Sequence, residues 1–277
     1  MSSVPAEDAS PSPAPGTTDP VDAAAVADFD AAYPGLRLPP LAVVIAAYDE
    51  EGAVGDVVRG LPERIAGQEA RAIVVVDGAT DGTAAEARAA GALVCDVPVN
   101  RGQGAALRLG YLLARRGGAC FIATTDADGQ YDAEDLERVV SPLVAGDADF
   151  VSGSRVLGEA HTSDRTRLLG VTVFAGVISV LTGQRITDPA NGLRAMRAEV
   201  AGAVELRQSQ YQASELLISA MARGFRVAEV PTTMRERAAG QTKKGRNLLY
   251  GARFGRVVVT TWWRERRRSG LANTTSS

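Results

Sequence analysis

The sequence predicts an α/β protein built on a doubly wound, mostly parallel sheet. Two observations support this: apolar runs rich in β-branched residues recur along the chain, and segments with a helical pattern separate them. The run at 41–48 is continuously apolar, which is typical of a strand whose two faces are both covered by helices. Ligands of such sheets bind beyond the carboxyl ends of the strands, so residues that follow each strand are the first site candidates.

The elements follow one another in a regular order. Asp81 and Asp132 are candidate N-caps for the helices that begin beside them, and Gly91 is a candidate helix end. The predicted strands cover 41–48, 72–77, 92–97, 120–125 and 149–154, and the predicted helices cover about 52–66, 80–91, 103–116 and 132–145.

The two ends of the chain differ in composition from its middle. Residues 1–38 are rich in Ala, Pro, Ser, Asp and Thr, which predicts a disordered leader. Residues 39–245 carry the strand and helix patterns of the predicted folded domain. Residues 246–277 are predicted to form a basic, Trp-containing helix and tail. Over 235–268 eleven basic residues stand against two acidic ones, and this local charge of +9 favours an anionic partner or a solvated surface.

Composition excludes several classes of protein. Hydrophobic residues make up 45% of the chain and charged residues 23%, which is ordinary for a globular protein. Cys95 and Cys120 both lie in apolar runs and are predicted to be reduced core residues. The single histidine, His161, makes histidine-based zinc or triad chemistry improbable. No apolar run reaches the roughly 20 residues of a spanning helix, and no signal peptide is evident, so we expect a cytoplasmic protein.

Acidic residues directly follow several predicted strands. They are Asp49 and Glu50, Asp77, and the pair Asp126 and Asp128. Because the carboxyl ends of parallel strands meet at one edge, these carboxylates converge and repel one another unless a cation lies among them. Ligation by oxygen alone favours Mg²⁺ or Mn²⁺, and such an ion usually bridges to phosphates.

Taken one at a time, the motifs also have structural explanations. Segment 46–51 fits a polar turn that enters a helix, where acids are favourable. The glycine-rich segments 76–83 and 100–110 do not complete a dinucleotide fingerprint, so a nicotinamide cofactor is not indicated. A calcium loop that began at Asp126 would need glycine at its sixth position, whereas Gly129 is at the fourth.

Seven motifs in order nevertheless form a specific pattern. The chain resembles the family 2 glycosyltransferases with a GT-A fold, and specifically their dolichol-phosphate mannose synthase-like, polyprenyl-phosphate glycosyltransferase branch, from about 41 to 260. The resemblance implies a Rossmann-like, doubly wound, mostly parallel sheet with a C-terminal, acceptor-side extension of helices and strands. The motifs are VVIAAYDEE, VVVDGATDGT, NRGQGAALRLGY, DADGQYDAEDL, DFVSGSR, ITDPANGLRAMR and EVPTTMRERAAGQTK.

The resemblance also implies roles for individual residues. Tyr48, Glu50 and Asp77 match the positions that hold the nucleotide base and ribose. Asp126 and Asp128 match the DxD pair that binds a metal across the donor pyrophosphate. The resemblance implies catalytic roles for Asp126, Asp128, Arg155 and Asp188, substrate binding by Ala46, Tyr48, Glu50, Asp77, Ala127, Arg194, Arg237 and Lys243, and metal binding by Asp126, Asp128 and Gln130.

Several positions depart from the family pattern. Ala46 stands where proline is frequent, and Val76 where many members have a first aspartate. Gln103 replaces a frequent lysine and Leu193 a frequent phenylalanine. No metal ligand is lost, but the preferred nucleotide base stays open.

The expected activity is metal-dependent, inverting glycosyl transfer. A hexose would move from a nucleotide sugar, GDP-mannose or UDP-glucose, onto polyprenyl phosphate at the cytoplasmic membrane face, with Mg²⁺ or Mn²⁺ and without nucleic acid. One alternative is transfer to a soluble or protein hydroxyl, which needs a carboxylate base such as Asp188. A second is a catalytically silent adaptor that binds sugar nucleotides. The oligomeric state stays open.

Two segments bear on a membrane surface. The apolar helix-length run at 165–185 has basic residues at both ends, so it fits either a buried core helix or an interfacial one. Trp262 and Trp263, followed by the basic run 264–268, suit a membrane–water interface. A tryptophan pair packed on the core is the alternative.

Overall fold

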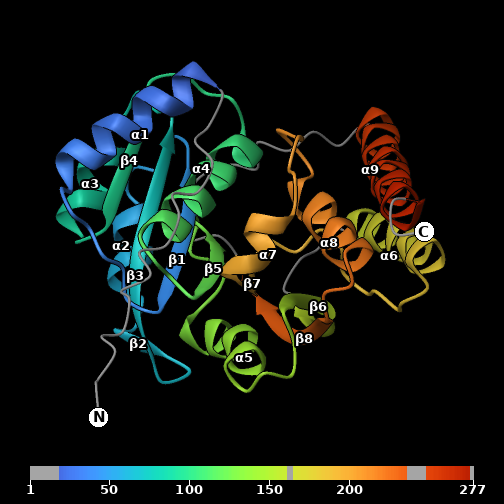
Figure 1. The fold of residues 1–277 in the computed structure, drawn as a ribbon. Helices are drawn as coiled ribbons and strands as arrows, with labels where there is room; N and C mark the ends of the chain where they lie inside the picture. Colours follow the sequence, from blue (N-terminus) through green and yellow to red (C-terminus); the bar gives the residue numbers. More distant parts are fainter. Residues whose placement is uncertain (1–18, 161–164, 236–247, 275–277) are drawn as a thin grey trace, which may run out of the picture.

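The computed structural model describes residues 19–160, 165–235 and 248–274. Within this part of the chain, eight strands form one sheet in the order β2-β3-β1-β5-β7-β6-β8, with β4 paired to β3 (Figure 1). The strands are β1 (Leu41–Ala47), β2 (Arg64–Ile65), β3 (Gln68–Asp77), β4 (Leu93–Val97), β5 (Phe121–Asp126), β6 (Phe150–Ala160), β7 (Arg194–Arg197) and β8 (Val227–Met234).

Helices cover both faces of this sheet. The four strands β4, β3, β1 and β5 are mutually parallel, and β7 runs antiparallel to both of its neighbours, β5 and β6. The predicted doubly wound, mostly parallel sheet is therefore confirmed. The helices are α1 (Pro20–Ala32), α2 (Val54–Arg59), α3 (Thr83–Ala89), α4 (Gln103–Arg116), α5 (Ala133–Val144), α6 (Arg165–Thr182), α7 (Ala198–Ala203), α8 (Gln212–Ala222) and α9 (Leu248–Thr274).

Strand β1 shows why the apolar runs are continuous. Ala42 and Val44 lie in the apolar core shared with α1, α4, α8 and α9. Val43 and Ile45 lie in a second core, shared with α2, α3 and α5. Since side chains alternate across a strand, a sheet covered on both faces needs apolar residues at every position.

The helix predicted at 52–66 is wrong in its second half. Helix α2 ends at Arg59, and Gly60 caps it. The chain then forms the short hairpin between β2 and β3, whose two turn residues, Ala66 and Gly67, both have positive φ. A two-residue hairpin turn of this kind matches the natural twist of the strands. Pro62 follows the cap and lacks an N–H group for a continuing helix.

The predicted disordered leader is also wrong within its described part. Residues 20–32 form α1, with Asp19 as N-cap and Pro20 in the first turn. Val26 and Phe29 are buried in the core beside β4, and the Val94 N–H donates to the Tyr33 hydroxyl at 3.0 Å. The alanine-rich composition suggested disorder, but the helix has a narrow apolar face, which is buried against β4. Residues 1–18 lie outside the described residues.

The two cysteines differ in environment. Cys95 is buried in β4, and its thiol lies 3.8 Å from the Ala25 carbonyl of α1. Cys120 is exposed, so the prediction of two core cysteines is wrong for it. Cys120 directly precedes β5.

The C-terminal helices lie at the end of the molecule away from α1 (Figure 1). The Phe174 ring of α6 packs against the Phe254 ring of α9 with centroids 4.4 Å apart. The Trp262 indole donates to the Leu181 carbonyl at 2.7 Å, whereas Trp263 is 56% exposed. One tryptophan thus packs on the protein and the other faces outward. No helix over the described residues has the length and apolar character required to span a membrane.

Candidate active site

A cavity of about 650 Å³ opens at the carboxyl ends of the central strands. Tyr48 follows β1, Asp77 ends β3, and Asp126 ends β5, so one sheet edge gathers side chains from three strands. Arg155 of β6 completes the same cavity. This is the place where open parallel sheets bind ligands.

Asp77 forms a rigid corner of the cavity. Its buried carboxylate accepts the backbone N–H of Arg101 at 3.1 Å and that of Gly102 at 2.7 Å. Burial raises the pKa of Asp77, although these two bonds oppose the shift. The Arg101 guanidinium in turn forms ion pairs with Asp19 and Asp22 of the N-terminal segment. Helix α1 therefore buttresses the loop that closes over Asp77.

Asp126 at the end of β5 and Asp128 in the turn that follows both line the cavity. Asp128 is buried, and Asp126 accepts the Gln103 side-chain amide at 3.1 Å. A Cβ added at Gly192 would lie 2.4 Å from an Asp126 carboxylate oxygen, so a larger residue there would displace the carboxylate. The position of the Asp126 carboxylate is thus fixed from two sides.

Asp126 and Asp128 are the residues of the cavity that could hold a metal ion. Within the described ranges, no three His, Cys, Asp or Glu side chains cluster closely enough to hold a metal. Asp126 and Asp128 could supply two oxygen ligands, and the remaining ligands would come from water or from a bound diphosphate. The Gln130 side-chain Nε2 donates a hydrogen bond to the Arg235 carbonyl at 2.9 Å.

Arg155 and Asp188 form a buried, bidentate ion pair. Arg155 Nε and Nη2 donate to the two Asp188 oxygens at 2.6 and 2.8 Å, and the Arg155 backbone N–H adds a bond at 3.1 Å. Burial would lower the pKa of Arg155, but Asp188 outweighs it and the pKa is raised. Asp188 is fully buried and does not line the cavity. It therefore orients Arg155, and the geometry disfavours the predicted catalytic role for Asp188.

The end of a loop at 205–211 lines the cavity through Ser209, Gln210 and Tyr211. The Gly104 N–H at the start of α4 donates to the Ser209 carbonyl at 2.9 Å, and a Cβ at Gly104 would lie 2.0 Å from the Gln208 carbonyl. Tyr211, at φ 61°, turns the chain into α8. Such a conformation is unfavourable for a tyrosine and persists because its surroundings hold it.

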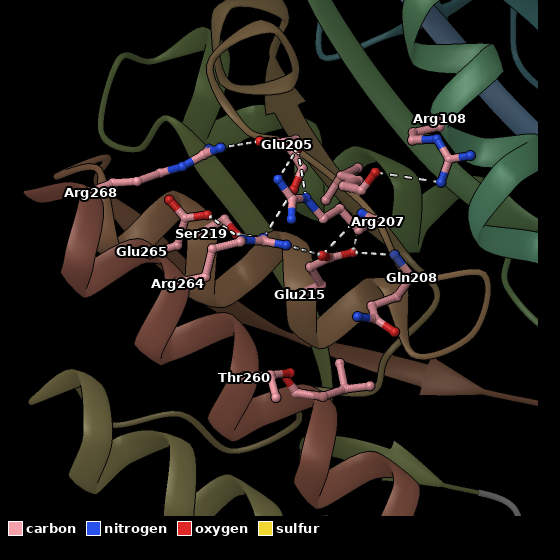
Figure 2. A network of polar contacts seen from close by, with 12 residues as sticks. Arg108, Glu205, Arg207, Gln208, Glu215, Ser219, Thr260, Arg264, Glu265 and Arg268 are labelled. Carbon is pink, nitrogen blue, oxygen red and sulfur yellow. Dashed lines mark hydrogen bonds and ion pairs between the residues drawn. The ribbon is translucent and has the colours of Figure 1, made fainter. Parts of the chain in front are cut away.

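Glu215 anchors this loop to the C-terminal helix (Figure 2). Its fully buried carboxylate accepts the backbone N–H groups of Arg207 and Gln208 at 2.9 to 3.1 Å. Arg264 of α9 donates to the same carboxylate at 2.9 Å. The Glu215 carboxylate thus joins α9 to the loop at 205–211, and α9 also lines the cavity directly through Arg253 and Phe254.

Comparison with known proteins decides the class. The family model described as glycosyl transferase family 2 matches residues 42–204. The chain is a family 2 glycosyltransferase. This glycosyltransferase is 36% identical over 228 residues to a dolichyl-phosphate hexose transferase of Haloferax volcanii, covering 82% of the chain and 96% of that relative. It is 32% identical over 194 residues to a polyprenol monophosphomannose synthase of Mycolicibacterium smegmatis, covering 66% and 73% of the two chains.

The glycosyltransferase also resembles solved structures. Glucosyl-3-phosphoglycerate synthase from Mycobacterium tuberculosis, solved with Mn²⁺, UDP and phosphoglyceric acid, superposes with a TM-score of 0.63 at 21% identity, covering 87% of this chain and 82% of that chain. The likeness confirms the predicted GT-A fold. The predicted family and enzyme class are confirmed as well.

Most of the residues predicted for the site of this glycosyltransferase share the cavity. Arg237 and Lys243 lie outside the described residues. Ten predicted residues line the cavity, namely Ala46, Tyr48, Glu50, Asp77, Asp126, Ala127, Asp128, Gln130, Arg155 and Arg194.

Sequence reasoning missed other lining residues. Tyr131 follows the carboxylate motif and donates from its hydroxyl to Asn191 at 3.0 Å; burial and then Asp126 raise its pKa. Tyr211 and Gln212 lie in no motif that the sequence marks. The one sequence signal near them is Glu215 in the segment YQASE, followed by apolar residues. A glutamate in such a segment is expected to be buried and to need hydrogen-bond partners nearby.

Proposed function

We propose that this enzyme moves a hexose from a nucleotide sugar onto polyprenyl phosphate, with Mg²⁺ or Mn²⁺. The observation that carries the proposal is the sharing of one cavity by Asp77, the pair Asp126 and Asp128, and the buried cation Arg155. The names of the Haloferax and Mycolicibacterium relatives support the hexose and the polyprenyl phosphate. GDP-mannose and UDP-glucose are the donors to test first.

The donor would extend from Asp77 to the carboxylate pair. Tyr48, Glu50 and Asp77 would hold the nucleoside, and Asp126 and Asp128 would hold a divalent ion against the diphosphate. Such an ion stabilises the negative charge that develops on the leaving diphosphate. The Mn²⁺ and Mg²⁺ in the titles of the synthase structures are consistent with this choice of metals.

An anionic acceptor suits the other end of the cavity. Arg155 and Arg194 line it, and both guanidinium groups are buried. A phosphate acceptor brings its own nucleophilic oxygen and needs no strong general base. Asp188, the carboxylate considered as a base for a hydroxyl acceptor, is occupied by Arg155. The occupied carboxylate favours the phosphate over a soluble or protein hydroxyl.

A long-chain acceptor also explains exposed apolar residues. Val156 and Leu157 are exposed beside Arg155, where the register between β6 and β8 shifts. Val173, Val177 and Val180 are exposed on one side of α6, spaced as residues on one helical face are. We infer that α6, with Trp263 of α9, rests on the cytoplasmic face of a membrane where the polyprenyl chain is embedded.

A product partition assay tests the proposal. Purified enzyme receives Mn²⁺, one labelled nucleotide sugar and polyprenyl phosphate in detergent, and label is counted in the organic phase. We expect metal-dependent organic label with one hexose donor and none with Asp128→Asn, because a loss of about 100-fold or more follows removal of charge stabilisation. The exposed variant Asp56→Asn serves as control.

Two results would contradict the proposal in different ways. Aqueous label with release of nucleoside diphosphate would retain glycosyl transfer and exclude the lipid acceptor. Turnover that survives Asp128→Asn or metal chelation would exclude the metal site.

A further inference from the structure

Gln212 carries a buried amide whose partners are missing from the part of the chain that the structure describes. It is the first residue of α8 and is 3% exposed. Neither its Nε2 nor its Oε1 has a hydrogen-bond partner among the described residues, although both atoms are buried. Leaving both ends of a buried amide unpaired is costly, and native proteins rarely do so without a reason. Gln212 lines the cavity, so a bound ligand can supply the missing partners.

Two contacts fix the position of Gln212 in the cavity. Three residues before it, the Ser209 carbonyl accepts the N–H of Gly104 in the first turn of α4. Two residues after it, the Ser214 hydroxyl donates to the Pro189 carbonyl at 2.8 Å. Gln212 therefore lies between the start of α4 and the segment that carries Asp188.

This position lies beside the carboxylate pair. The first residue of α4, Gln103, donates to Asp126, and Gly192, close to Pro189 in the chain, packs against the same carboxylate. The start of α8 is thus held between two segments that both contact Asp126. A group attached to a diphosphate at Asp126 would come within the reach of Gln212.

The chemistry of the amide selects a neutral group. An amide offers a donor and an acceptor, and a hydroxyl group is likewise both donor and acceptor. A phosphate offers only acceptors, so it would leave Oε1 unpaired. The buried guanidinium of Arg194, whose Nη1 has no partner within the described residues, suits a phosphate better.

We propose that Gln212 binds a hydroxyl group of the transferred hexose and so contributes to the choice of sugar. The inference rests on the proposed function, because it assumes a hexose donor. A site built to pair with a hydroxyl discriminates strongly against an analogue that lacks it, since its own polar atoms are then left unpaired. Gln212 is thus a specificity residue that lines the cavity from outside the motifs marked in the sequence.

Binding measurements separate this role from a structural one. Calorimetric titrations in Mn²⁺ compare UDP-glucose with UDP, and GDP-mannose with GDP, for the wild type, Gln212→Met and Gln208→Met. We expect Gln212→Met to lose about tenfold in affinity for the preferred sugar nucleotide and nothing for its nucleoside diphosphate. Its melting temperature should stay equal or rise, because the unpaired amide is gone. Gln208 does not line the cavity and holds Glu215 through its backbone N–H, which a methionine keeps, so Gln208→Met is the matched control.

Each other outcome has a distinct meaning. Equal losses for the sugar nucleotide and the diphosphate, or no loss for either, would overturn the inference. A Gln212→Met effect confined to the KM of polyprenyl phosphate would overturn it too and assign Gln212 to the acceptor. A wild type that binds neither nucleotide in Mn²⁺ would overturn the proposed function itself, together with this inference.

Discussion

At the scale of single residues, the buried pair of Arg155 and Asp188 shows how the site is prepared before a ligand arrives. Asp188 meets both the side chain and the backbone N–H of Arg155, and the Asn191 amide lies 3.4 Å from one of its oxygens. A guanidinium held this way presents its charge to the cavity without reorganising, which is how charge stabilisation is most effective.

Asp188→Asn should therefore cost stability as well as turnover. It leaves the Arg155 charge buried without its carboxylate, which destabilises folded proteins by about 3–5 kcal/mol. Urea unfolding followed by circular dichroism measures the change. If Asp188 were instead a general base, turnover would collapse while the unfolding midpoint stayed at the wild-type value.

The two cysteines permit a second test at this scale. Burial, and then the charge of Asp22, raise the pKa of the Cys95 thiol to about 12, so it stays neutral at ordinary pH. Native protein at pH 8.5 should react with iodoacetamide at the exposed Cys120 alone, and mass spectrometry identifies the modified peptide. Both thiols should react after unfolding, and Cys120→Ser should abolish native labelling. Rapid native labelling of Cys95 would contradict the packing of α1 on β4.

The Cys95 shift also gives a pH dependence. The folded state keeps the proton of Cys95 to higher pH than the unfolded chain does. The stability that this neutral thiol contributes is present below the ordinary thiol pKa and declines as the pH rises from there toward about 12.

At the scale of elements, the contact between α8 and α9 links the outer helix to the cavity. Arg264→Met removes the only side-chain cation that the described residues bring to Glu215, which then remains buried with backbone donors alone. We expect a loss of about 3 kcal/mol in unfolding free energy and a higher KM for the sugar nucleotide.

Arg268→Met is the matched control for this test. Arg268 pairs with Glu205 at the surface of the same helix (Figure 2), and exposed pairs contribute at most about 1 kcal/mol. Equal effects of the two substitutions would exclude a special role for Glu215.

The elements also show how far sequence reasoning reaches. Strands β1 and β3 are predictable because covered faces demand apolar residues at every position, and Asp132 caps α5 as predicted. The loop at 205–211 is not predictable, because its course depends on Gly104 of α4, which lies far from it in sequence, and on Glu215 of α8, whose burial the sequence does not show. Gln212 was missed because a single glutamine gives no functional signal in the sequence until its burial is known.

At the scale of the whole molecule, α6 and α9 come from distant parts of the sequence and lie side by side through Phe174 and Phe254. The first 18 residues of the chain and the segment 236–247, which holds Arg237 and Lys243, lie outside the described residues. The membrane role proposed for this end of the molecule depends on the exposed valines of α6.

Replacing Val177 and Val180 together by lysine tests that role. Val177 is 41% and Val180 85% exposed, so neither side chain belongs to the buried core. Two valines that enter a bilayer interface contribute enough apolar burial that their loss should weaken liposome binding at least about tenfold. Vesicle co-sedimentation measures this, while binding of nucleoside diphosphate stays unchanged. Val144→Lys on α5 is the control, and equal liposome binding by all three proteins would exclude the α6 surface.

The bond between Tyr33 and Val94 has a consequence for solubility. Within the described residues, β4 pairs only with β3, so its other side is the outer edge of the sheet. Unpaired backbone groups on such an edge invite another strand to add, which is a common start of aggregation. The Tyr33 hydroxyl occupies one of these donors, and α1 packs beside it. We therefore expect the acidic N-terminal segment to hinder the pairing of β4 with a strand of another molecule. A chain that begins after Tyr33 would expose this sheet edge and should aggregate more readily.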